Sequence, residues 1–275
     1  MIEDINWNKM WMESMKNASW RKRRGDNTEF WNKRARRYNE SLKDNERPGK
    51  SISKLDIDPS HTVLDIGAGP GTLTIPLAKK VKHVTVVEPS SGMLTCLREN
   101  AINEGLNNIT CINKKWEDAV PGEDLGEYDV VIASYSLAML DIKKALLKMH
   151  KVARHSVCLF TFVGDNMWDY TELWPVLYNE TYKSGPDYIY IYNILYQIGI
   201  MADVEISITE HKQRFSNIDE AVDQWKENLN ISTPEAEEII RSYLSANLIR
   251  EDGSLWSKIN MKVASICWRK ENEIK

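Results

Sequence analysis

The stretch VLDIGAGPGTLTIPLA, residues 63–78, decides the fold. One apolar run leads into it, another leads out, and Gly67, Gly69 and Gly71 occupy alternate positions between them. Glycines at this density weaken any helix or strand, so the pattern predicts a strand, a tight loop and the start of a helix. Such a loop presents free backbone N–H groups and the positive end of a helix dipole to a ligand. We expect a Cβ at Gly67 or Gly69 to intrude where a close-fitting, nucleotide-like ligand lies.

Two kinds of segment alternate around this loop. Apolar, β-branched runs typical of buried strands lie at 61–66, 82–88, 108–113, 128–134 and 156–163, with helix-like stretches at 72–80, 90–104 and 141–152. This alternation predicts a parallel sheet with right-handed crossovers. Two later strands are predicted at 202–211 and 262–270, and the interval between them carries helix-start signals at Ser216 and at Thr233 followed by Pro234.

The composition narrows the class of protein. A chain of 275 residues can bury one large core and still supply extensions. It has no apolar run that could span a bilayer, and its first residues lack the apolar region of a signal peptide. Cys96, Cys111, Cys158 and Cys267 lack CxxC spacing, so we expect reduced core cysteines in a cytoplasmic protein. The five histidines show no metal-ligand spacing, and no metal is expected.

Acidic residues near the loop distinguish between cofactors. A dinucleotide fingerprint G-x-G-x-x-G read from Gly67 fails, because its sixth position is Thr72. The sequence has D-x-G-x-G-x-G instead, beginning at Asp65. Glu88 ends the second predicted strand. A carboxylate there can accept hydrogen bonds from both hydroxyls of a ribose, each worth about 1.5–3 kcal/mol.

Together VLDIGAGPG (63–71), VTVVEPS (84–90) and YDVVIAS (128–134) resemble the class I S-adenosylmethionine (SAM)-dependent methyltransferases, over about residues 60–163. The resemblance implies an α/β fold with a Rossmann-like, doubly wound, seven-stranded sheet whose last strand is antiparallel. It also implies SAM as the cofactor and methyl transfer as the reaction. Residues 1–55 would form an N-terminal helical extension that covers the cofactor. Residues 56–275 would form the methyltransferase domain, with helical insertions at about 164–200 and 211–260.

The resemblance also assigns cofactor contacts. Asp65 would organise the loop near the amino-acid end of SAM, and Glu88 would bind the ribose hydroxyls. Many relatives carry an Asp after the third strand, where this chain has Lys115 and Trp116. The adenine would then meet the backbone and the ring of Trp116, unless that ring simply packs on the sheet edge. The other expected contacts are Gly67, Ala68, Gly69, Gly71, Pro89, Met93, Glu117 and Ser134.

Ser134 and Tyr135 are the catalytic candidates, because they end the fourth strand at the edge where doubly wound sheets bind ligands. Tyr135 would polarise the acceptor or contact the sulfonium by cation–π attraction; the alternative is a wall residue with no chemical role. In-line methyl transfer depends on orientation, which can contribute about 7–11 kcal/mol, and a general base is optional.

The segment FWNKRARRY (30–38) places Trp31, Arg34 and Tyr38 on one helical face. This pattern is similar to the N-terminal helix of quinone-biosynthesis-type methyltransferases, which covers the cofactor. The resemblance implies that Arg34 and Tyr38 bind the SAM carboxylate. The alternative is a helix that packs through Trp31 alone.

The segment 168–199 is rich in tryptophan and tyrosine, and a helix is predicted between Pro186 and Gly199. Its stripe of Tyr188, Tyr192 and Tyr196, with Trp168, is expected to bind the acceptor, since tyrosines offer flat contact area and a polar tip. An aromatic stripe at this spacing can equally belong to the core.

The charge distribution bears on the partner. Residues 1–55 contain 14 Lys and Arg against 8 Asp and Glu, so the remainder of this chain of net charge −4 is strongly acidic. A small-molecule acceptor in an aromatic pocket is favoured. The alternative is an RNA or protein acceptor that meets the basic N-terminal segment, although the fourth strand ends in ASYS (133–136) rather than in the [N/D]-P-P-[Y/F] tetrad of base-amine methyltransferases. A SAM-binding regulator without turnover is the third alternative.

Overall fold

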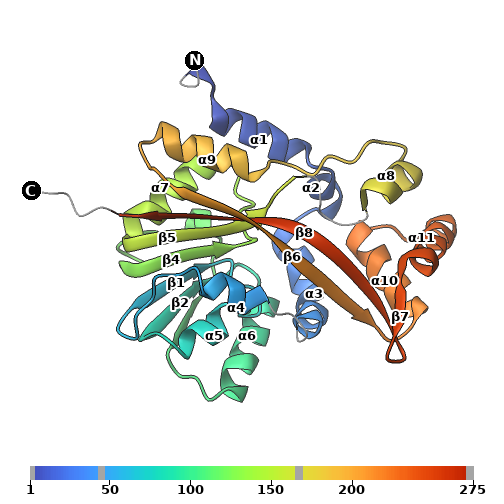
Figure 1. Cartoon of the computed structure of the whole chain (residues 1–275), viewed down its shortest axis with the longest axis horizontal. Coiled ribbons are helices and arrows are strands. Elements are labelled where there is room, and N and C mark those ends of the chain that lie inside the picture. Colours follow the sequence, from blue (N-terminus) through green and yellow to red (C-terminus); the bar gives the residue numbers. More distant parts are fainter. Residues whose placement is uncertain (1–3, 43–46, 165–169, 271–275) are drawn as a thin grey trace, which may run out of the picture.

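The computed structural model describes residues 4–42, 47–164 and 170–270. Its strands are β1 (Thr62–Ile66), β2 (His83–Val87), β3 (Ile109–Ile112), β4 (Tyr128–Ser134), β5 (Ala153–Phe162), β6 (Asp203–Phe215), β7 (Ile249–Glu251) and β8 (Ser254–Arg269). They form one sheet in the order β3-β2-β1-β4-β5-β8-β6, with β7 paired to β8 (Figure 1). Strands β1 to β5 are parallel, and β8 is antiparallel to both β5 and β6. The predicted Rossmann-like sheet with an antiparallel closing strand is confirmed, and the short β7 is an addition to it.

Helices cover both faces of the sheet. They are α1 (Trp7–Asn17), α2 (Ser19–Arg24), α3 (Asn27–Ser41), α4 (Arg47–Ile52), α5 (Thr74–Ala78), α6 (Ser91–Asn103), α7 (Ile142–Val152), α8 (Tyr170–Tyr178), α9 (Tyr188–Gln197), α10 (Ile218–Leu229) and α11 (Pro234–Asn247). One core cluster joins the sheet to α1, α7 and α9, and a second joins it to α4, α5 and α6. The central strands are apolar on both sides for this reason. Among the described residues, no helix has the length and apolar character that crossing a membrane requires.

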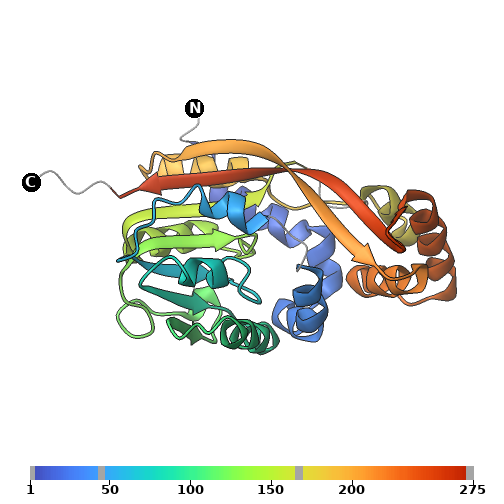
Figure 2. The ribbon, with the colours of Figure 1, turned by 60° about the horizontal axis from the view of Figure 1, so that its bottom comes forward.

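Strands β6 and β8 form a long two-stranded ribbon that reaches beyond the rest of the sheet (Figures 1 and 2). At its far end α8, α10 and α11 pack around Trp174, Phe215 and Trp225 in a third core cluster. Both strands are longer than predicted. Buried and exposed residues alternate in β6 as far as Phe215, so the strand continues past residue 211.

The two helices between β6 and β8 begin at capping residues. At α11 the Ala236 N–H donates to Thr233 Oγ1 (3.2 Å), as predicted. At α10 the cap is Asn217, one residue later than predicted, and its Oδ1 accepts from the Glu220 N–H (2.9 Å). The Ser216 N–H donates back to the Glu220 carboxylate (2.7 Å), which completes a reciprocal capping arrangement.

Helix α3 packs directly against α6 and thereby joins the N-terminal segment to the sheet. A Cβ on Gly92 would lie 3.2 Å from the Ala35 Cβ, so the two helices approach closely because this residue is glycine. The side-chain oxygen of Asn32 accepts from the Ser90 hydroxyl (2.7 Å) and from the Gly92 N–H (3.0 Å). An α3 residue therefore binds polar groups at the N-terminus of α6.

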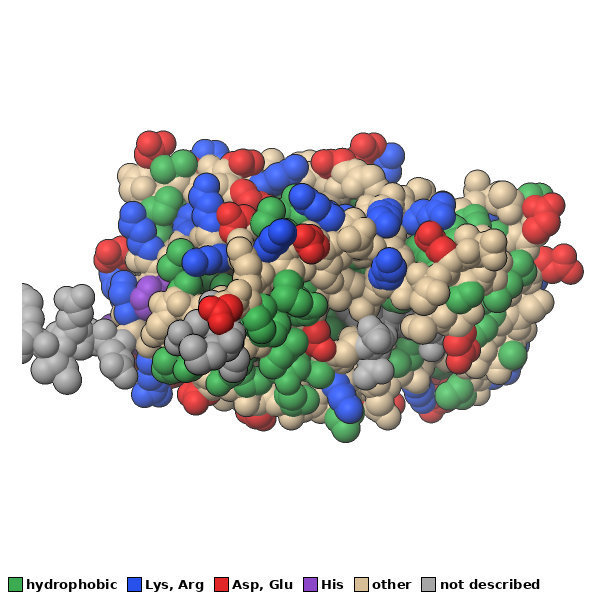
Figure 3. Space-filling model, turned by 90° about the horizontal axis from the view of Figure 1, so that it is seen from above, with side chains coloured by type: hydrophobic (Ala, Val, Ile, Leu, Met, Phe, Trp, Pro, Cys, Tyr) green, Lys and Arg blue, Asp and Glu red, His purple; other side chains and the backbone are tan. Residues whose placement is uncertain are grey.

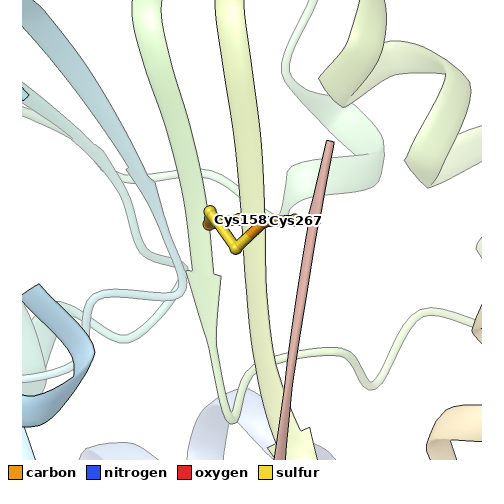
Figure 4. Close-up of a disulfide and its surroundings, with 2 residues drawn as sticks. All are labelled: Cys158 and Cys267. Carbon is orange, nitrogen blue, oxygen red and sulfur yellow. A yellow bond between two sulfur atoms is a disulfide. The ribbon is translucent and has the colours of Figure 1, made fainter. Parts of the chain in front are cut away.

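Cys158 on β5 and Cys267 on β8 form a disulfide across the antiparallel pair (Figure 4). Their Cα atoms are 4.2 Å apart, and 109 positions separate them in the sequence. This corrects the expectation that all four cysteines are reduced; Cys96 and Cys111 are the free thiols. The spacing of the cysteines in the sequence could not reveal this pair, because the two residues meet only when the last strand, β8, lies beside β5.

We expect the protein, purified without reductant and denatured, to titrate two thiols per chain, and four after reduction. Because the bridge closes a long loop, reduction should lower the free energy of unfolding by about 2–4 kcal/mol, measured by urea denaturation. The double variant Cys158→Ser, Cys267→Ser should match the reduced protein. Four reactive thiols before reduction would contradict the bridge.

Candidate functional site

A cavity of about 710 Å³ lies at the carboxyl ends of β1, β2 and β4. One end is formed by the glycine loop and Glu88, which we call the sheet end. The other end is walled by α1, α2, the turn after β4 and residues 182–190, and we call it the aromatic end. A cavity of this size suits a cofactor or another small-molecule ligand.

The three glycines of the loop all have positive φ, but their surroundings differ. A Cβ on Gly67 would lie 2.3 Å from the Ser136 Cβ, and one on Gly71 would lie 3.1 Å from side chains of α5 and α6. A Cβ on Gly69 would meet no atom within 4 Å, although Gly69 lines the cavity. Only at Gly69 does the space beside the glycine remain open for a ligand. At Gly67 the nearer obstacle is the protein itself.

Glu88 lies at the sheet end and is 6% exposed. Its carboxylate accepts from the Gly69 N–H (3.0 Å) and from the Ser90 N–H (2.8 Å), so it joins the loop after β1 to the turn after β2. Burial raises the pKa of this carboxyl, and the two backbone donors oppose the rise. A carboxylate has about four acceptor positions. Two backbone bonds therefore leave acceptor capacity toward the cavity, where a ribose would bind.

Asp65 is buried at the end of β1 and accepts a hydrogen bond from the Thr74 hydroxyl (2.6 Å), which fastens the start of α5 to the strand. Burial raises the pKa of Asp65 to about 7; the Thr74 bond opposes the rise and the nearby Glu88 charge adds to it. Ala68 and Pro89 complete this end of the cavity. Two acidic groups at one end favour a ligand that carries positive charge.

The residues after β3 also reach the cavity, but the Trp116 ring points into the core. The side chain is 3% exposed, its Nε1 lies 3.4 Å from the Ala145 carbonyl oxygen, and the Lys148 ammonium lies 4.5 Å above the ring. This environment matches the alternative in which the Trp116 ring packs on the edge of the sheet. A ring held in this way is not placed to stack on an adenine. Lys115 and Glu117 are exposed cavity residues on either side of it.

Trp31, Arg34 and Tyr38 of α3 all line the cavity. Trp31 packs with Met93 of α6 and lies edge-on to Tyr38, with ring centroids 5.2 Å apart. The Arg34 guanidinium lies 3.8 Å above the Phe30 ring and donates to a backbone carbonyl of α10. The face predicted from the sequence thus forms one wall, and its contact with a SAM carboxylate stays a prediction.

Ser134 and Tyr135 line the cavity where β4 ends. Tyr135 has a φ of +53°, a backbone conformation that residues other than glycine rarely adopt. Its ring centroid lies 4.5 Å from that of Phe162. The bend directs the next residue, Ser136, onto the loop, where its hydroxyl donates to the Ile66 carbonyl (2.6 Å). No motif in the sequence pointed to Ser136.

The predicted tyrosine stripe of Tyr188, Tyr192 and Tyr196 does not line the cavity, which corrects the expectation that it binds the acceptor. Helix α9 forms as predicted, but Tyr192 and Tyr196 are 37% and 49% exposed and do not line the cavity. Tyr188 packs against the core instead. Figure 3 looks onto the face that carries α1 and α9, where apolar side chains are exposed. Within the predicted segment 168–199, the tyrosines that line the cavity are Tyr182 and Tyr190. Trp168 lies outside the described residues.

Sequence reasoning missed the walls that α1 and α2 supply. Trp11 and Trp20 both line the cavity. The Trp11 Nε1–H donates to the Met139 carbonyl (2.8 Å) and the Trp20 Nε1–H to the Ser184 carbonyl (2.8 Å). The tryptophan-rich N-terminal segment was the available signal. The β6 residues His211 and Gln213 also face the cavity. Within the described ranges, no group of three His, Cys, Asp or Glu side chains could hold a metal ion.

Comparisons with known proteins agree with this geometry. Residues 63–156 match the family model of the methyltransferase domain. The chain belongs to the class I SAM-dependent methyltransferases. An uncharacterized protein of Haemophilus influenzae is 32% identical over 182 residues, 66% of either chain.

A more distant relative, named "Probable ribosomal RNA small subunit methyltransferase A", comes from Methanosphaera stadtmanae. It is 34% identical over 106 residues, 35% of this chain and 38% of that protein, so the similarity spans well under two thirds of its length. Among solved structures, the YcgJ protein of Bacillus subtilis has a TM-score of 0.57 at 16% identity, over 82% of this chain and 98% of that one. At this identity the likeness concerns the fold.

The methyltransferase offers a matched pair of glycine variants. We expect Gly69→Ala to fold, at a cost of about 1 kcal/mol for its positive φ, and to weaken SAM binding at least tenfold in calorimetry. Gly67→Ala should instead lose about 2–4 kcal/mol of unfolding free energy, because its Cβ meets Ser136. Unchanged SAM affinity in Gly69→Ala would mean that the loop does not contact the cofactor.

Glu88→Ala is expected to weaken SAM binding at least tenfold, since it removes the carboxylate proposed to hold the ribose. It also removes the bonds to Gly69 and Ser90, so a thermal melt should accompany the calorimetry. Asn113→Ala is a matched control. Asn113 stabilises the same turn by donating to the carbonyls of Glu88 (2.9 Å) and Pro89 (2.9 Å), but it does not line the cavity. Equal losses in both variants would assign Glu88 a purely structural role.

Proposed function

We propose that the protein transfers the methyl group of SAM to a small-molecule acceptor held in the aromatic end of the cavity. The continuity of that cavity carries the proposal. It joins the glycine loop and Glu88 to walls formed by Trp11, Trp20 and Tyr190. A small acceptor between these walls would lie next to the cofactor in the same cavity.

Bound SAM supplies an electrophilic methyl group, which the acceptor takes by in-line displacement. The chain's contribution is to bind and to orient. Glu88 and the Gly69 backbone would hold the nucleoside, while Ser134 and Tyr135 would border the reacting atoms. The aromatic walls would exclude water and fix the plane of the acceptor.

The N-terminal residues 1–55 would act as the cover of the cofactor. Helix α3 is fixed to α6 through Asn32 and through Arg36, whose guanidinium donates to both Glu99 oxygens (3.2 and 3.0 Å). It is fixed to α10 by the Arg37–Glu227 ion pair (2.7 Å). With these contacts the segment forms a wall of the cavity and not a free arm.

An RNA acceptor is the second candidate, because the Methanosphaera relative is named a ribosomal RNA methyltransferase and the N-terminal segment is basic. The structure offers less support for it. Arg23, Arg36 and Arg37 each form an ion pair within the chain. On the face seen in Figure 3, basic side chains are interspersed with acidic and apolar ones and form no continuous stripe.

Incubation with methyl-labelled SAM distinguishes the acceptors. We expect label to enter the low-molecular-weight fraction of a metabolite extract with wild-type protein, and much less of it with Glu88→Ala at a SAM concentration well below that variant's dissociation constant. Label in purified ribosomal RNA that falls steeply with added salt would favour the RNA acceptor. SAM binding with no label in either fraction would favour a regulator without turnover.

We also propose that the protein works in the cytoplasm. The Cys158–Cys267 bridge bears on it, because disulfides persist mainly in oxidising compartments and are rare in the cytosol. A cytoplasmic protein would keep these two adjacent cysteines as thiols in the cell.

A further inference from the structure

We infer that the acceptor is a flat molecule bearing a carboxylate, and that Arg21 binds this group. The inference rests on the proposed function and assigns the chemical class of its substrate. Arg21 belongs to α2 and lines the aromatic end of the cavity.

Arg21 lies beside the turn that follows the catalytic candidates. Its Nη1 donates to the Ala138 carbonyl (3.0 Å), four residues after Ser134. The guanidinium is therefore fixed to the segment that ends β4, close to where methyl transfer would occur. A group bound by Arg21 would hold the rest of the acceptor next to that segment.

The charge of Arg21 has no carboxylate partner within the described part of the chain. Its neighbour Arg23 pairs with Glu180 (3.6 Å), and Arg37 across the cavity pairs with Glu227 (2.7 Å). The Ala138 bond uses one of the five guanidinium donors. The others keep the planar fork that matches a carboxylate in two parallel hydrogen bonds.

Two of the acidic residues that line the same cavity, Asp187 and Glu88, bind other groups. Asp187 accepts from the Gly164 N–H (2.9 Å) and from the N–H of Tyr188 at the start of α9. Glu88 accepts from two backbone N–H groups at the sheet end. These bonds leave Arg21 as a cation available for an incoming anion.

The surrounding walls determine the rest of the ligand. Trp11 and Trp20 line the same cavity as Arg21, and so do the apolar residues Leu137 and Met139. Both indole N–H groups are already bonded to backbone carbonyls. The rings therefore offer flat apolar surface and no polar contact, and an anionic group of the ligand would be bound by Arg21.

Isothermal calorimetry on the full chain with saturating S-adenosylhomocysteine tests this. The probes are three pairs that differ only in charge: benzoate and benzamide, 2-naphthoate and 2-naphthamide, indole-3-carboxylate and its amide. We expect at least one carboxylate to bind tenfold or more tightly than its amide. Arg21→Gln should abolish that preference, and Arg21→Lys should retain part of it. Lys22→Gln, an exposed neighbour that does not line the cavity, should retain all of it.

The inference would be overturned by no carboxylate preference in any pair, by a preference that persists in Arg21→Gln, or by an equal loss in Lys22→Gln. A tenfold loss of S-adenosylhomocysteine affinity in Arg21→Gln would also overturn it, by assigning the arginine to the cofactor. Thermal melts of each variant exclude unfolding as the cause. Failure of the wild type to bind S-adenosylhomocysteine would defeat the proposed function instead, and the same probe pairs without it would still test Arg21.

Discussion

Two hydrogen bonds, from the backbone N–H groups of Gly69 and Ser90 to the Glu88 carboxylate, hold the sheet end of the cavity together. Parallel strands bring the loop after β1 and the turn after β2 to the same edge, where the Gly67 N–H donates to the carbonyl of Val87, the last residue of β2 (2.7 Å). Glu88 extends this connection from the strand end to Gly69 and Ser90. A carboxylate can make this connection because it accepts several bonds at once. Burial works against its charge, and the two N–H donors offset that cost. A cation in the cavity, such as the sulfonium of SAM, would favour the charged form further.

The turn that Glu88 holds is also held from outside. Asn32 of α3 accepts from the Ser90 hydroxyl and from the Gly92 N–H, and the missing side chain of Gly92 allows Ala35 to approach. The N-terminal extension is therefore connected to the same few residues as the ribose-binding candidate. A change in α3 would move the turn after β2 as well as the wall that α3 forms, so the positions of α3 and of Glu88 are coupled.

The strands around the glycine loop could be predicted from the sequence, because burial on both faces leaves continuous apolar runs. The placement of Asp65, Gly69 and Glu88 at one edge of the sheet could be predicted for a related reason: each position is set by backbone geometry at a fixed distance from a strand end. The predictions that proved wrong depended on contacts between residues that are distant in the sequence. Tyr192 and Tyr196 turn outward because Ile191 and Leu195 take the core-facing side of α9. The same limit hid the partner of Cys158 and the contact between Gly67 and Ser136, which joins residues 69 positions apart.

The difference between the two ends of the cavity follows from the groups that build them. The sheet end would bind its ligand through backbone N–H groups and the Glu88 carboxylate, so its requirements on the sequence are strict and local. The aromatic end is assembled from side chains of α1, α2, residues 182–190 and β6, which are distant in sequence. Side-chain walls can change while the strands beneath them stay fixed, so the acceptor can differ among proteins that share this sheet. The acceptor must therefore be inferred from the assembled wall, in which Arg21 is the cation that we propose to bind it.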